Sequence, residues 1–484
     1  MQYLLGIDIG TSSVKVLSFT PKGQLLGRVS RSYTILQPTP DRSEQRPEEV
    51  FNGVIDALET AIAKNGGEPI GMSWGAAMHS FIPLDEHDRP LTPCLLWSDR
   101  RSLAQCHLLR QSSLGEEVAR HSGSPIHPML PICKIRWLRE HQPEIFAKSA
   151  RFVSLKEYIW KRLFGTFLVD WSTAAASGLF DHEEMDWYEP ALEFAGIRRD
   201  QLSVPVPPSH TINSPPEDYP LLDCPSIIGS TDGCLANLGA GAKDENTLVA
   251  SIGSSGALRI TNTQPLKAAG EKLFSYPISR KSFVCGAPIN NGGLAYRWFV
   301  EHIMSLDSKA AASLQEEAAA LAPGADGLLF LPYLLGERAP HWNAGLRAAF
   351  FGLHLNHGPA HLLRAVMEGV IFSLFDSAQI MKERGIRPKA ISANGGFVRS
   401  PLWVQILADV FGLPVQASEG GDEAAIGSAM LGLEALGKTD GWQAASDFSN
   451  TVRQYLPDAD RHHRYQQIFQ SYRRLFEQLL PLQD

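Results

Sequence analysis

Apolar runs of strand length alternate along much of the chain with segments whose apolar residues recur every three or four positions. Residues 46–67 carry such a helical stripe, formed by Val50, Val54, Leu58 and Ile62. The same spacing predicts helices over residues 361–385 and 400–412, and both segments end at a glycine. Strands that alternate with helices are typical of an α/β fold, which we therefore predict for this chain.

Residues 4–16, LLGIDIGTSSVKV, interrupt an apolar run with an aspartate, a glycine, three hydroxyls and a lysine. They predict two short strands joined by a polar bend, in which Gly10 lets the backbone approach a ligand. The hydroxyls, the backbone N–H groups and Lys15 suit a phosphate. Asp8 would repel a bare phosphate, so its place here makes sense only beside a metal ion. An ordinary polar hairpin is the alternative.

The segment TLVASIGSSGALRIT, from Thr247, repeats this design about half a chain length later. When Asp8 is aligned with Ser251, the following residues fall in register as Ile9/Ile252, Gly10/Gly253, Thr11/Ser254 and Ser12/Ser255. One copy in each half of the chain predicts two hairpins that grip one polyphosphate. Only the first copy keeps the carboxylate, so only the first hairpin would contact the metal ion.

Two further motifs follow apolar strand segments. Asp232 lies in a Ser-Thr-Asp-Gly bend after Ile227 and Ile228, where a carboxylate is well placed to act as a base toward an attacking alcohol. The alternative for Asp232 is an Asx-turn or a helix N-cap. Later in the chain, Gly395 and Gly396 would let a flat aromatic ring lie against bare backbone, although an ordinary glycine turn has the same sequence.

The composition argues against several classes of function. A chain of 484 residues is too long for one core, so two or three domains are expected. Charged residues make up 20% and hydrophobic residues 44%, and the net charge of −8 argues against nucleic acid or an anionic membrane as the main partner. The six cysteines form no CxxC pair, which indicates neither a zinc site nor a disulfide framework. The N-terminus lacks a signal-peptide pattern, so we expect a soluble cytoplasmic protein.

Two long stretches resemble the signature patterns of a known family. MLPICKIRWLREH, residues 129–141, and AAFFGLHLNHGPAHLLRAVME, residues 348–368, look like the two signatures of the FGGY carbohydrate kinases, which belong to the actin/hexokinase-like ATPase superfamily. The resemblance covers essentially the whole chain. It implies two RNase-H-like domains with a cleft between them. Residues 1–243 would bind the sugar and carry the first phosphate hairpin, and residues 244–484 would carry the second hairpin and the adenosine site.

The resemblance also implies roles for individual residues. Asp232 matches the catalytic base of the family. The positions that match the sugar site are Met78, His79, Trp97, Asp99 and Arg101. The positions that match the ATP site are Asp8, Thr11, Ser12, Lys15, Gly253, Ser254, Gly395 and Gly396. ATP and Mg²⁺ are the implied cofactors, and Asp8 would reach the metal through water.

Within the family, the likeness is greatest to the gluconokinases. Segments such as GSPIHPMLP, GSTDGCLANLG and LPYLLGERAPHWN look like that branch, whereas xylulokinases usually show Gly-Gln-Met-His-Gly where this chain has Ala-Ala-Met-His-Ser at residues 76–80. We therefore expect transfer of the ATP γ-phosphoryl group to the terminal hydroxyl of D-gluconate, which gives 6-phosphogluconate. A xylulokinase or another sugar or polyol kinase of the family is the alternative.

The carboxylate of gluconate needs a hydrogen-bond donor or a cation. The candidates are His79, His127, Arg101 and Arg297, and the sequence does not choose between them. A function of a different class, a non-catalytic actin-like ATP sensor, would keep both hairpins but would not need Asp232. The sequence leaves the oligomeric state open, with a homodimer as one option.

Overall fold

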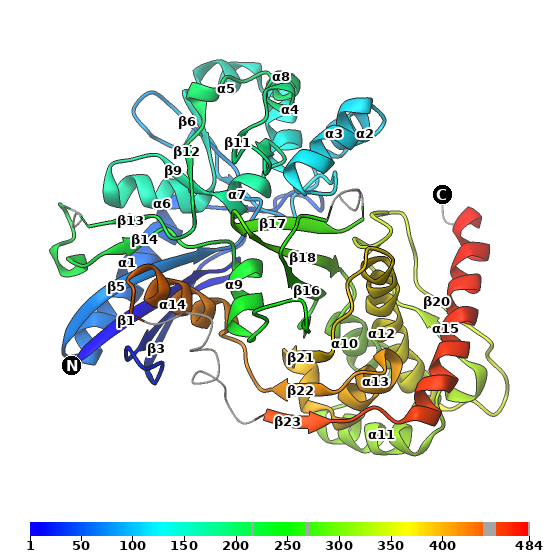
Figure 1. Ribbon diagram of the computed structural model, residues 1–484. Coiled ribbons are helices and arrows are strands. Elements are labelled where there is room, and N and C mark those ends of the chain that lie inside the picture. Colours follow the sequence, from blue (N-terminus) through cyan, green and yellow to red (C-terminus); the bar gives the residue numbers. More distant parts are fainter. Residues whose placement is uncertain (214–216, 267–271, 439–451, 483–484) are drawn as a thin grey trace. The chain divides into compact units, whose positions relative to one another are not determined.

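The computed structural model describes residues 1–213, 217–266, 272–438 and 452–482 (Figure 1). The chain divides into two compact units. Unit 1 comprises Met1–Lys243, Thr261–Cys285 and Asp422–Phe448, and unit 2 comprises Asp244–Ile260, Gly286–Gly421 and Ser449–Asp484. The chain thus first leaves unit 1 after Lys243, where the sequence places the domain boundary, and two later segments return to unit 1. The α/β class is confirmed.

Unit 1 is built on a six-stranded sheet with the strand order β13-β14-β5-β1-β2-β3. The strands are β1 (Gln2–Ile9), β2 (Ser13–Phe19), β3 (Leu25–Ser32), β5 (Glu68–Ala76), β13 (Thr211–Ile212) and β14 (Ser226–Ile227). β1 pairs antiparallel with β2 and parallel with β5. The central position of β1 explains why its apolar residues are buried on both faces.

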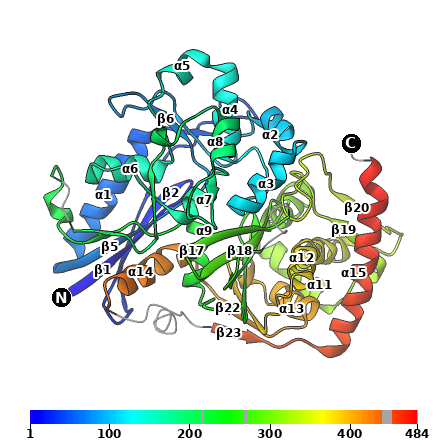
Figure 2. The ribbon, with the colours of Figure 1, turned by 45° about the horizontal axis from the view of Figure 1, so that its top comes forward.

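Helices cover both faces of this sheet. Alternate residues of β1, such as Leu5 and Ile7, join a core with α1 (Pro47–Asn65) and α6 (Leu155–Phe164). Leu4 points the other way and joins a second core with α9 (Asp232–Gly239) and α14 (Glu423–Ala435). Figure 2 shows α1 and α14 on opposite sides of β1 and β5. Because side chains alternate along a strand, Asp8 shares a face with Leu4 and therefore points toward α9 and α14.

The close approach of α14 to the sheet requires glycine. A Cβ on Gly6 of β1 would lie 2.2 Å from the carbonyl oxygen of Ala425, and a Cβ on Gly427 would lie 1.9 Å from that of Leu235 on α9. Ser428 of α14 also donates a hydrogen bond of 2.7 Å to the carbonyl of Ser73 on β5. These contacts explain why α14, which is distant in sequence from β1 and β5, belongs to unit 1.

The remaining elements of unit 1 are short and carry the motifs that the sequence assigns to the sugar. The strands among them are β4 (Glu44–Gln45), β6 (Ile82–Leu84), β7 (Cys94–Leu95), β8 (Arg151–Val153), β9 (Leu168–Asp170), β10 (Phe180–Asp181), β11 (Asp186–Trp187), β12 (Val204–Val206) and β17 (Phe274–Ser279). The helices are α2 (Leu103–Arg110), α3 (Ser113–Ser122), α4 (Pro131–His141), α5 (Pro143–Lys148), α7 (Trp171–Ala175) and α8 (Glu189–Ala195).

Unit 2 contains most of a seven-stranded sheet with the order β17-β18-β16-β15-β21-β22-β23. Its strands are β15 (Thr247–Ile252), β16 (Gly256–Asn262), β18 (Ser282–Ile289), β21 (Ala390–Asn394), β22 (Val415–Ser418) and β23 (Val452–Tyr455). A separate hairpin consists of β19 (Leu329–Leu331) and β20 (Ala349–Phe351), and the helices are α10 (Gly293–Arg297), α11 (Ser308–Ala320), α12 (Pro359–Glu383), α13 (Pro401–Phe411) and α15 (Ala459–Leu479). β15 pairs antiparallel with β16 and parallel with β21, as β1 does with β2 and β5. The repeat seen in the sequence is therefore a repeat of strand pairing.

The three helices predicted from apolar spacing are present. α1 ends at Gly66, whose φ of 54° lies in the left-handed region. α13 begins after Ser400, whose side chain accepts a hydrogen bond from the backbone N–H of Trp403. α12 begins at Pro359, two residues before the predicted start, because proline fits the first turn of a helix. None of the described helices combines the length and the hydropathy that a bilayer-spanning segment needs.

Candidate functional site

Asp8 stands near the end of β1, beside two other carboxylates. Its Oδ1 atom is buried and has no hydrogen-bond partner. Burial, and then the neighbouring carboxylates of Asp232 and Glu423, raise the pKa of Asp8 to about 7, against the opposing effect of Lys15. Carboxylates that crowd together in a buried place favour a proton or a cation between them. Asp8 is thus placed to hold a cation.

The first predicted phosphate hairpin has a well-defined bend. The last strand pair, Ile9 with Val14, encloses a four-residue bend in which the Gly10 N–H donates to the Ser13 carbonyl at 3.0 Å. The hydroxyl of Tyr33 donates to the Gly10 carbonyl. Tyr33 therefore holds the first residue of the bend, whereas Ser12, at the tip of the bend, is exposed.

Two side chains outside the hairpin hold Thr11. The indole Nε1 of Trp97 donates to the Thr11 hydroxyl at 3.1 Å, and Gln45 Nε2 donates to the Thr11 carbonyl at 2.5 Å. Lys15, on the strand that leaves the bend, lies 3.4 Å from a carboxylate oxygen of Asp422. Asp422 directly precedes α14, so α14 and the hairpin are linked by an ion pair.

Asp232 is the first residue of α9. Thr231 occupies the N-cap position, and the Asp232 carboxylate accepts a hydrogen bond of 2.7 Å from the N–H of Gly233. Asp232 is half-buried, and its carboxylate is close enough to Asp8 to influence the pKa of Asp8. Asp232, the predicted base, and Asp8, the predicted metal ligand, therefore lie close enough within unit 1 for their charges to interact.

The Met78-His79 segment is anchored by a lysine that the sequence analysis did not select. The ammonium of Lys134, on α4, donates to the carbonyls of His79 and Leu96 at 2.7 Å each. Lys134 is fully buried, and burial lowers its pKa to about 7. His79 has a φ of 66°, and its Nδ1 lies 2.7 Å from the carbonyl of Ala176. One buried amine thus connects the segments that carry Met78 and Trp97.

Asp99 and Arg101 form a closed group with Glu44. Asp99 is fully buried and accepts hydrogen bonds from the Ser43 N–H at 2.9 Å and from Arg101 at 2.8 and 2.7 Å. Arg101 also pairs with Glu44, and its side chain is only 6% exposed. The guanidinium of Arg101 is therefore neutralised by two carboxylates of the protein. These contacts indicate that Arg101 supports the Trp97 segment. They argue against Arg101 as the residue that binds a substrate carboxylate.

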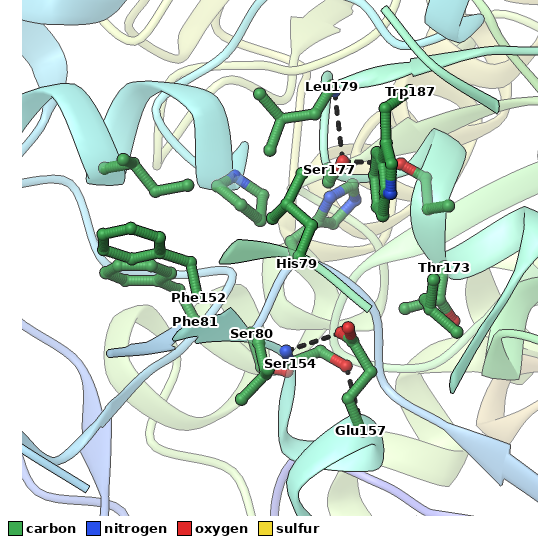
Figure 3. Close-up of a pocket in the computed structure, with 16 residues that line it drawn as sticks. His79, Ser80, Phe81, Phe152, Ser154, Glu157, Thr173, Ser177, Leu179 and Trp187 are labelled. Carbon is green, nitrogen blue, oxygen red and sulfur yellow. Dashed lines mark hydrogen bonds between the residues drawn. The ribbon is translucent and has the colours of Figure 1, made fainter. Parts of the chain in front are cut away.

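Figure 3 shows a small cavity behind His79. Its volume is about 30 Å³, and its walls include the stacked rings of Phe81 and Phe152 and the side chains of Glu157 and Trp187. A volume of this size holds about one water molecule and cannot hold a six-carbon sugar acid. The cavity is part of the packing that supports the His79 segment and is not the substrate site.

The second hairpin, in unit 2, has a shorter bend than the first. The pair Ile252 with Gly256 encloses three residues, and the Gly253 N–H donates to the Ser255 carbonyl at 2.9 Å. The Ser254 hydroxyl, which is exposed, accepts a hydrogen bond of 2.7 Å from Arg297 on α10. Arg297, a candidate for the substrate carboxylate in the sequence, is thus found beside the second phosphate hairpin.

The glycine pair after β21 lies next to this hairpin. Gly395 has a φ of 100°, and a Cβ there would lie 2.4 Å from the carbonyl oxygen of Ile252. Gly396 opens a short 3₁₀ helix, η5 (Gly396–Arg399), and a Cβ there would meet nothing within 4 Å. Gly395 is required by the backbone, whereas Gly396 leaves open space against which a flat ring could lie.

The structure brings the predicted residues together in two groups, one in each unit. Unit 1 gathers Asp8, Thr11, Lys15, Asp232, Trp97 and the His79 segment, and unit 2 gathers Gly253, Ser254, Gly395 and Gly396. Sequence reasoning missed Lys134. Lys134 lies in the 129–141 signature, which could have pointed to it, but nothing in the sequence shows the two carbonyls to which it donates.

Comparison with known proteins identifies the family to which the chain belongs. The N-terminal domain of the FGGY family of carbohydrate kinases matches residues 3–239, and the C-terminal domain of that family matches residues 248–436. The chain belongs to the FGGY family of carbohydrate kinases. It is accordingly a phosphotransferase, and the alternative of a non-catalytic ATP sensor is not supported.

Individual members of the family to which the chain is similar include gluconokinases and xylulose kinases. The chain is 37% identical over 481 residues to a gluconokinase of Bacillus subtilis, with coverage of 96% of this chain and 94% of the relative. It is 31% identical to a xylulose kinase of Escherichia coli, with 99% of each chain covered. Among solved structures, the gluconate kinase of Lactobacillus acidophilus superposes with a TM-score of 0.94 at 30% identity, with 99% of this chain and 98% of that chain covered.

Proposed function

We propose that this protein transfers the γ-phosphoryl group of ATP to the 6-hydroxyl of D-gluconate in the cytoplasm. The observation that carries the proposal is that the buried Oδ1 atom of Asp8 has no hydrogen-bond partner and that Asp232, at the start of α9, is close enough to raise the pKa of Asp8. The substrate follows from the gluconokinase of Bacillus subtilis and the gluconate kinase of Lactobacillus acidophilus, to which the whole chain is similar.

The residues present fit Mg²⁺. The Oδ1 atom of Asp8 is a buried oxygen without a partner, and it is close to the carboxylates of Asp232 and Glu423. The described residues include no group of three or more His, Cys, Asp or Glu side chains arranged to hold a metal by themselves. Mg²⁺ in phosphoryl-transfer enzymes is usually bound by one or two carboxylates together with substrate phosphates and waters, which agrees with Asp8 as the main protein ligand. The ion would neutralise phosphate charge.

Asp232 would act on the attacking hydroxyl. A primary alcohol scarcely ionises at neutral pH, so Asp232 accepts its proton while the new O–P bond forms, a contribution of about 10²- to 10⁴-fold. The loose transition state of phosphoryl transfer depends more on alignment and charge neutralisation. Thr11, Ser12 and Lys15 in unit 1 and Gly253 and Ser254 in unit 2 are the groups we assign to the phosphates, and Gly395 and Gly396 are assigned to the adenosine.

We assign the gluconate carboxylate to His127, and the hydrogen bond that this ring accepts within the protein supports the assignment. The Nδ1 atom of His127 accepts a hydrogen bond of 3.2 Å from the Met129 N–H, so the neutral ring carries its proton on Nε2. His79 has the opposite tautomer, because its Nδ1 must donate to the carbonyl of Ala176. In a neutral His79 ring, Nε2 is therefore an acceptor atom and not a donor. Arg101 is already paired with carboxylates.

The test is a comparison of substrates. Purified protein is assayed for ADP release with D-gluconate and with D-xylulose, in each case with ATP and Mg²⁺. We expect a kcat/KM for gluconate at least tenfold above that for xylulose. The reverse order would favour the second candidate, a xylulokinase, which is supported by the similarity to the xylulose kinase of Escherichia coli. Size-exclusion chromatography coupled to light scattering determines whether the enzyme is a monomer or a homodimer.

A further inference from the structure

A buried cluster of Lys156, Asp170 and Ser172 lies directly against the loop that precedes Asp232. From its hydrogen bonds we infer that this cluster sets the orientation of Asp232, so that Lys156, Asp170 and Ser172 are positioning residues for the base. The inference rests on the proposed role of Asp232. All of the residues concerned belong to unit 1, and none of the three was selected from the sequence.

Asp170 is the centre of the cluster. It is fully buried at the end of β9, where it caps α7. Its Oδ2 accepts hydrogen bonds from Lys156 Nζ at 2.8 Å and from the Thr173 hydroxyl at 2.6 Å. Its Oδ1 accepts from the Ser172 hydroxyl and, at 3.0 Å, from the Thr173 N–H. Four donors fix this carboxylate, which in turn fixes the two side chains that reach the Asp232 loop.

The Ser172 hydroxyl has one possible arrangement of hydrogen bonds. A carboxylate can only accept, so the single proton of Ser172 goes to Asp170. The two acceptor sites of the same oxygen then receive the Ser230 hydroxyl at 2.6 Å and the Thr231 N–H at 3.0 Å. Ser172 is fully buried, and its hydroxyl has no capacity left. The direction of each bond is thus determined by the charge of Asp170.

Lys156 reaches the same loop from the other side. Its Nζ, 2.8 Å from Asp170, also donates to the carbonyl of Ser230 at 3.3 Å. The carbonyl of Ser230 and the N–H of Thr231 are the two polar ends of one peptide unit. Lys156 holds one end and Ser172 holds the other, so the plane of the peptide immediately before the N-cap of α9 is fixed. The next residue is Asp232.

The cost of burying these charges argues for a role beyond stability. An ion pair removed from water often contributes less to folding than apolar side chains of the same volume would. Here the side chains of Lys156 and Asp170 are only 4% and 0% exposed. Among the described residues, the hydrogen bonds that the side chains of Lys156, Asp170 and Ser172 make outside the cluster and α7 all go to Ser230 or Thr231. An error of about 1 Å in the position of a catalytic group can lower a rate about 100-fold, so the cluster secures a part of the chain where position matters most.

The experiment compares Ser172→Ala with Ser122→Ala. Ser122 is a matched control because it is equally buried, donates to the Val118 carbonyl and accepts from the Ser124 N–H, but does not contact the Asp232 loop. For Ser172→Ala we expect kcat with gluconate to fall about 10- to 100-fold, while KM for gluconate and the Kd for ATP change less than about threefold. Ser122→Ala should lower Tm to a similar degree with kcat close to that of the parent enzyme.

Two further variants decide between the possible outcomes. Lys156→Met releases the carbonyl side of the same peptide, so it should also lower kcat, and combining it with Ser172→Ala should lower kcat by much less than the product of the single effects. Equal kcat values for Ser172→Ala and Ser122→Ala would overturn the inference. Asp232→Asn tests the proposed function separately: if this variant phosphorylates gluconate at the parent rate, the assignment of the base is wrong. If Asp232→Asn is inactive while Ser172→Ala is unaffected, only the positioning role is wrong.

Discussion

The indole nitrogen of Trp97 donates a hydrogen bond of 3.1 Å to the hydroxyl of Thr11. Trp97 belongs to the motif that the sequence assigns to the sugar, whereas Thr11 belongs to the hairpin that it assigns to phosphate. The two motifs are 86 residues apart in the chain. Because Gln45 holds the carbonyl of the same threonine, the tip of the hairpin is oriented by residues of the sugar side. The segments that we assign to sugar and to phosphate in unit 1 are therefore joined by direct hydrogen bonds.

Trp97→Phe tests this link. The substitution keeps an aromatic ring and removes one hydrogen bond to Thr11, so kcat/KM for ATP should fall about three- to tenfold. Trp160→Phe is the matched control, because the Trp160 indole N–H is buried and makes no hydrogen bond. Steady-state kinetics with ATP varied at saturating gluconate give the measurement. If both variants change ATP kinetics equally, the hydrogen bond to Thr11 has no effect on the phosphate site.

His127→Asn separates the carboxylate receptor from its structural role. The Asn Oδ1 atom can accept the Met129 N–H as the Nδ1 of His127 does, but the Asn amide nitrogen then takes the place of the imidazole Cδ2 and does not reach the position of the Nε2–H donor. We expect KM for gluconate to rise about 10- to 100-fold, since a hydrogen bond to a charged group is lost. Activity with D-xylulose, which has no carboxylate, should change less than about threefold.

His107→Asn, on the exposed side of α2, serves as the control for His127→Asn. It should leave both substrates unaffected. An equal loss with gluconate and xylulose in His127→Asn would mean that His127 supports the fold of the sugar site and does not contact the carboxylate.

Local features of the fold were predictable from the sequence, because they depend on neighbouring residues. The stripe at Val50, Val54 and Leu58 is buried as expected, and the bend after Ile9 has the expected hairpin geometry. Such features arise from periodicity and from the backbone preferences of glycine and proline.

The partners of individual side chains were not predictable. Lys134 donates to carbonyls 55 and 38 residues away in the chain, and a backbone carbonyl leaves no trace in the sequence. Arg101 looked free to bind a substrate carboxylate because its partner Glu44 is 57 residues away. In both cases the fold, which brings distant segments together, decides whether a charge is free for a ligand or already neutralised.

Arg297→Ala distinguishes a phosphate role from a sugar role for this arginine. Arg297 donates to the Ser254 hydroxyl at 2.7 Å, in the hairpin assigned to phosphate. Loss of its charge should raise KM for ATP about tenfold, because charge-assisted hydrogen bonds to phosphate are among the stronger ones. KM for gluconate should stay within about twofold. Lys309→Ala, an exposed cation on α11, controls for the change in net charge. A rise in KM for gluconate alone would assign Arg297 to the substrate carboxylate.

The buried amine of Lys134 should make the free energy of unfolding depend on pH. Burial lowers its pKa to about 7, and a neutral amine still has two N–H groups, enough for the carbonyls of His79 and Leu96. Above pH 7 the unfolded chain keeps a proton on this lysine that the folded chain has lost, so raising the pH favours the folded state. Between pH 7 and 8.5 the free energy of unfolding should gain about 2 kcal/mol from this one group.

Lys134→Met removes that gain. We expect Tm of the parent enzyme to rise relative to that of Lys134→Met as the pH increases from 7 to 8.5, measured by calorimetry without ligands. Lys148→Met, at an exposed position on α5, should follow the parent enzyme. The window ends at pH 8.5 because burial raises the pKa of Cys94 and Cys224 to about 12, and such thiols lower the stability at higher pH as they ionise in the unfolded chain. Parallel Tm curves for the parent enzyme and Lys134→Met would show that the buried amine stays charged in the folded protein. In that case its two hydrogen bonds would still hold the carbonyls of His79 and Leu96.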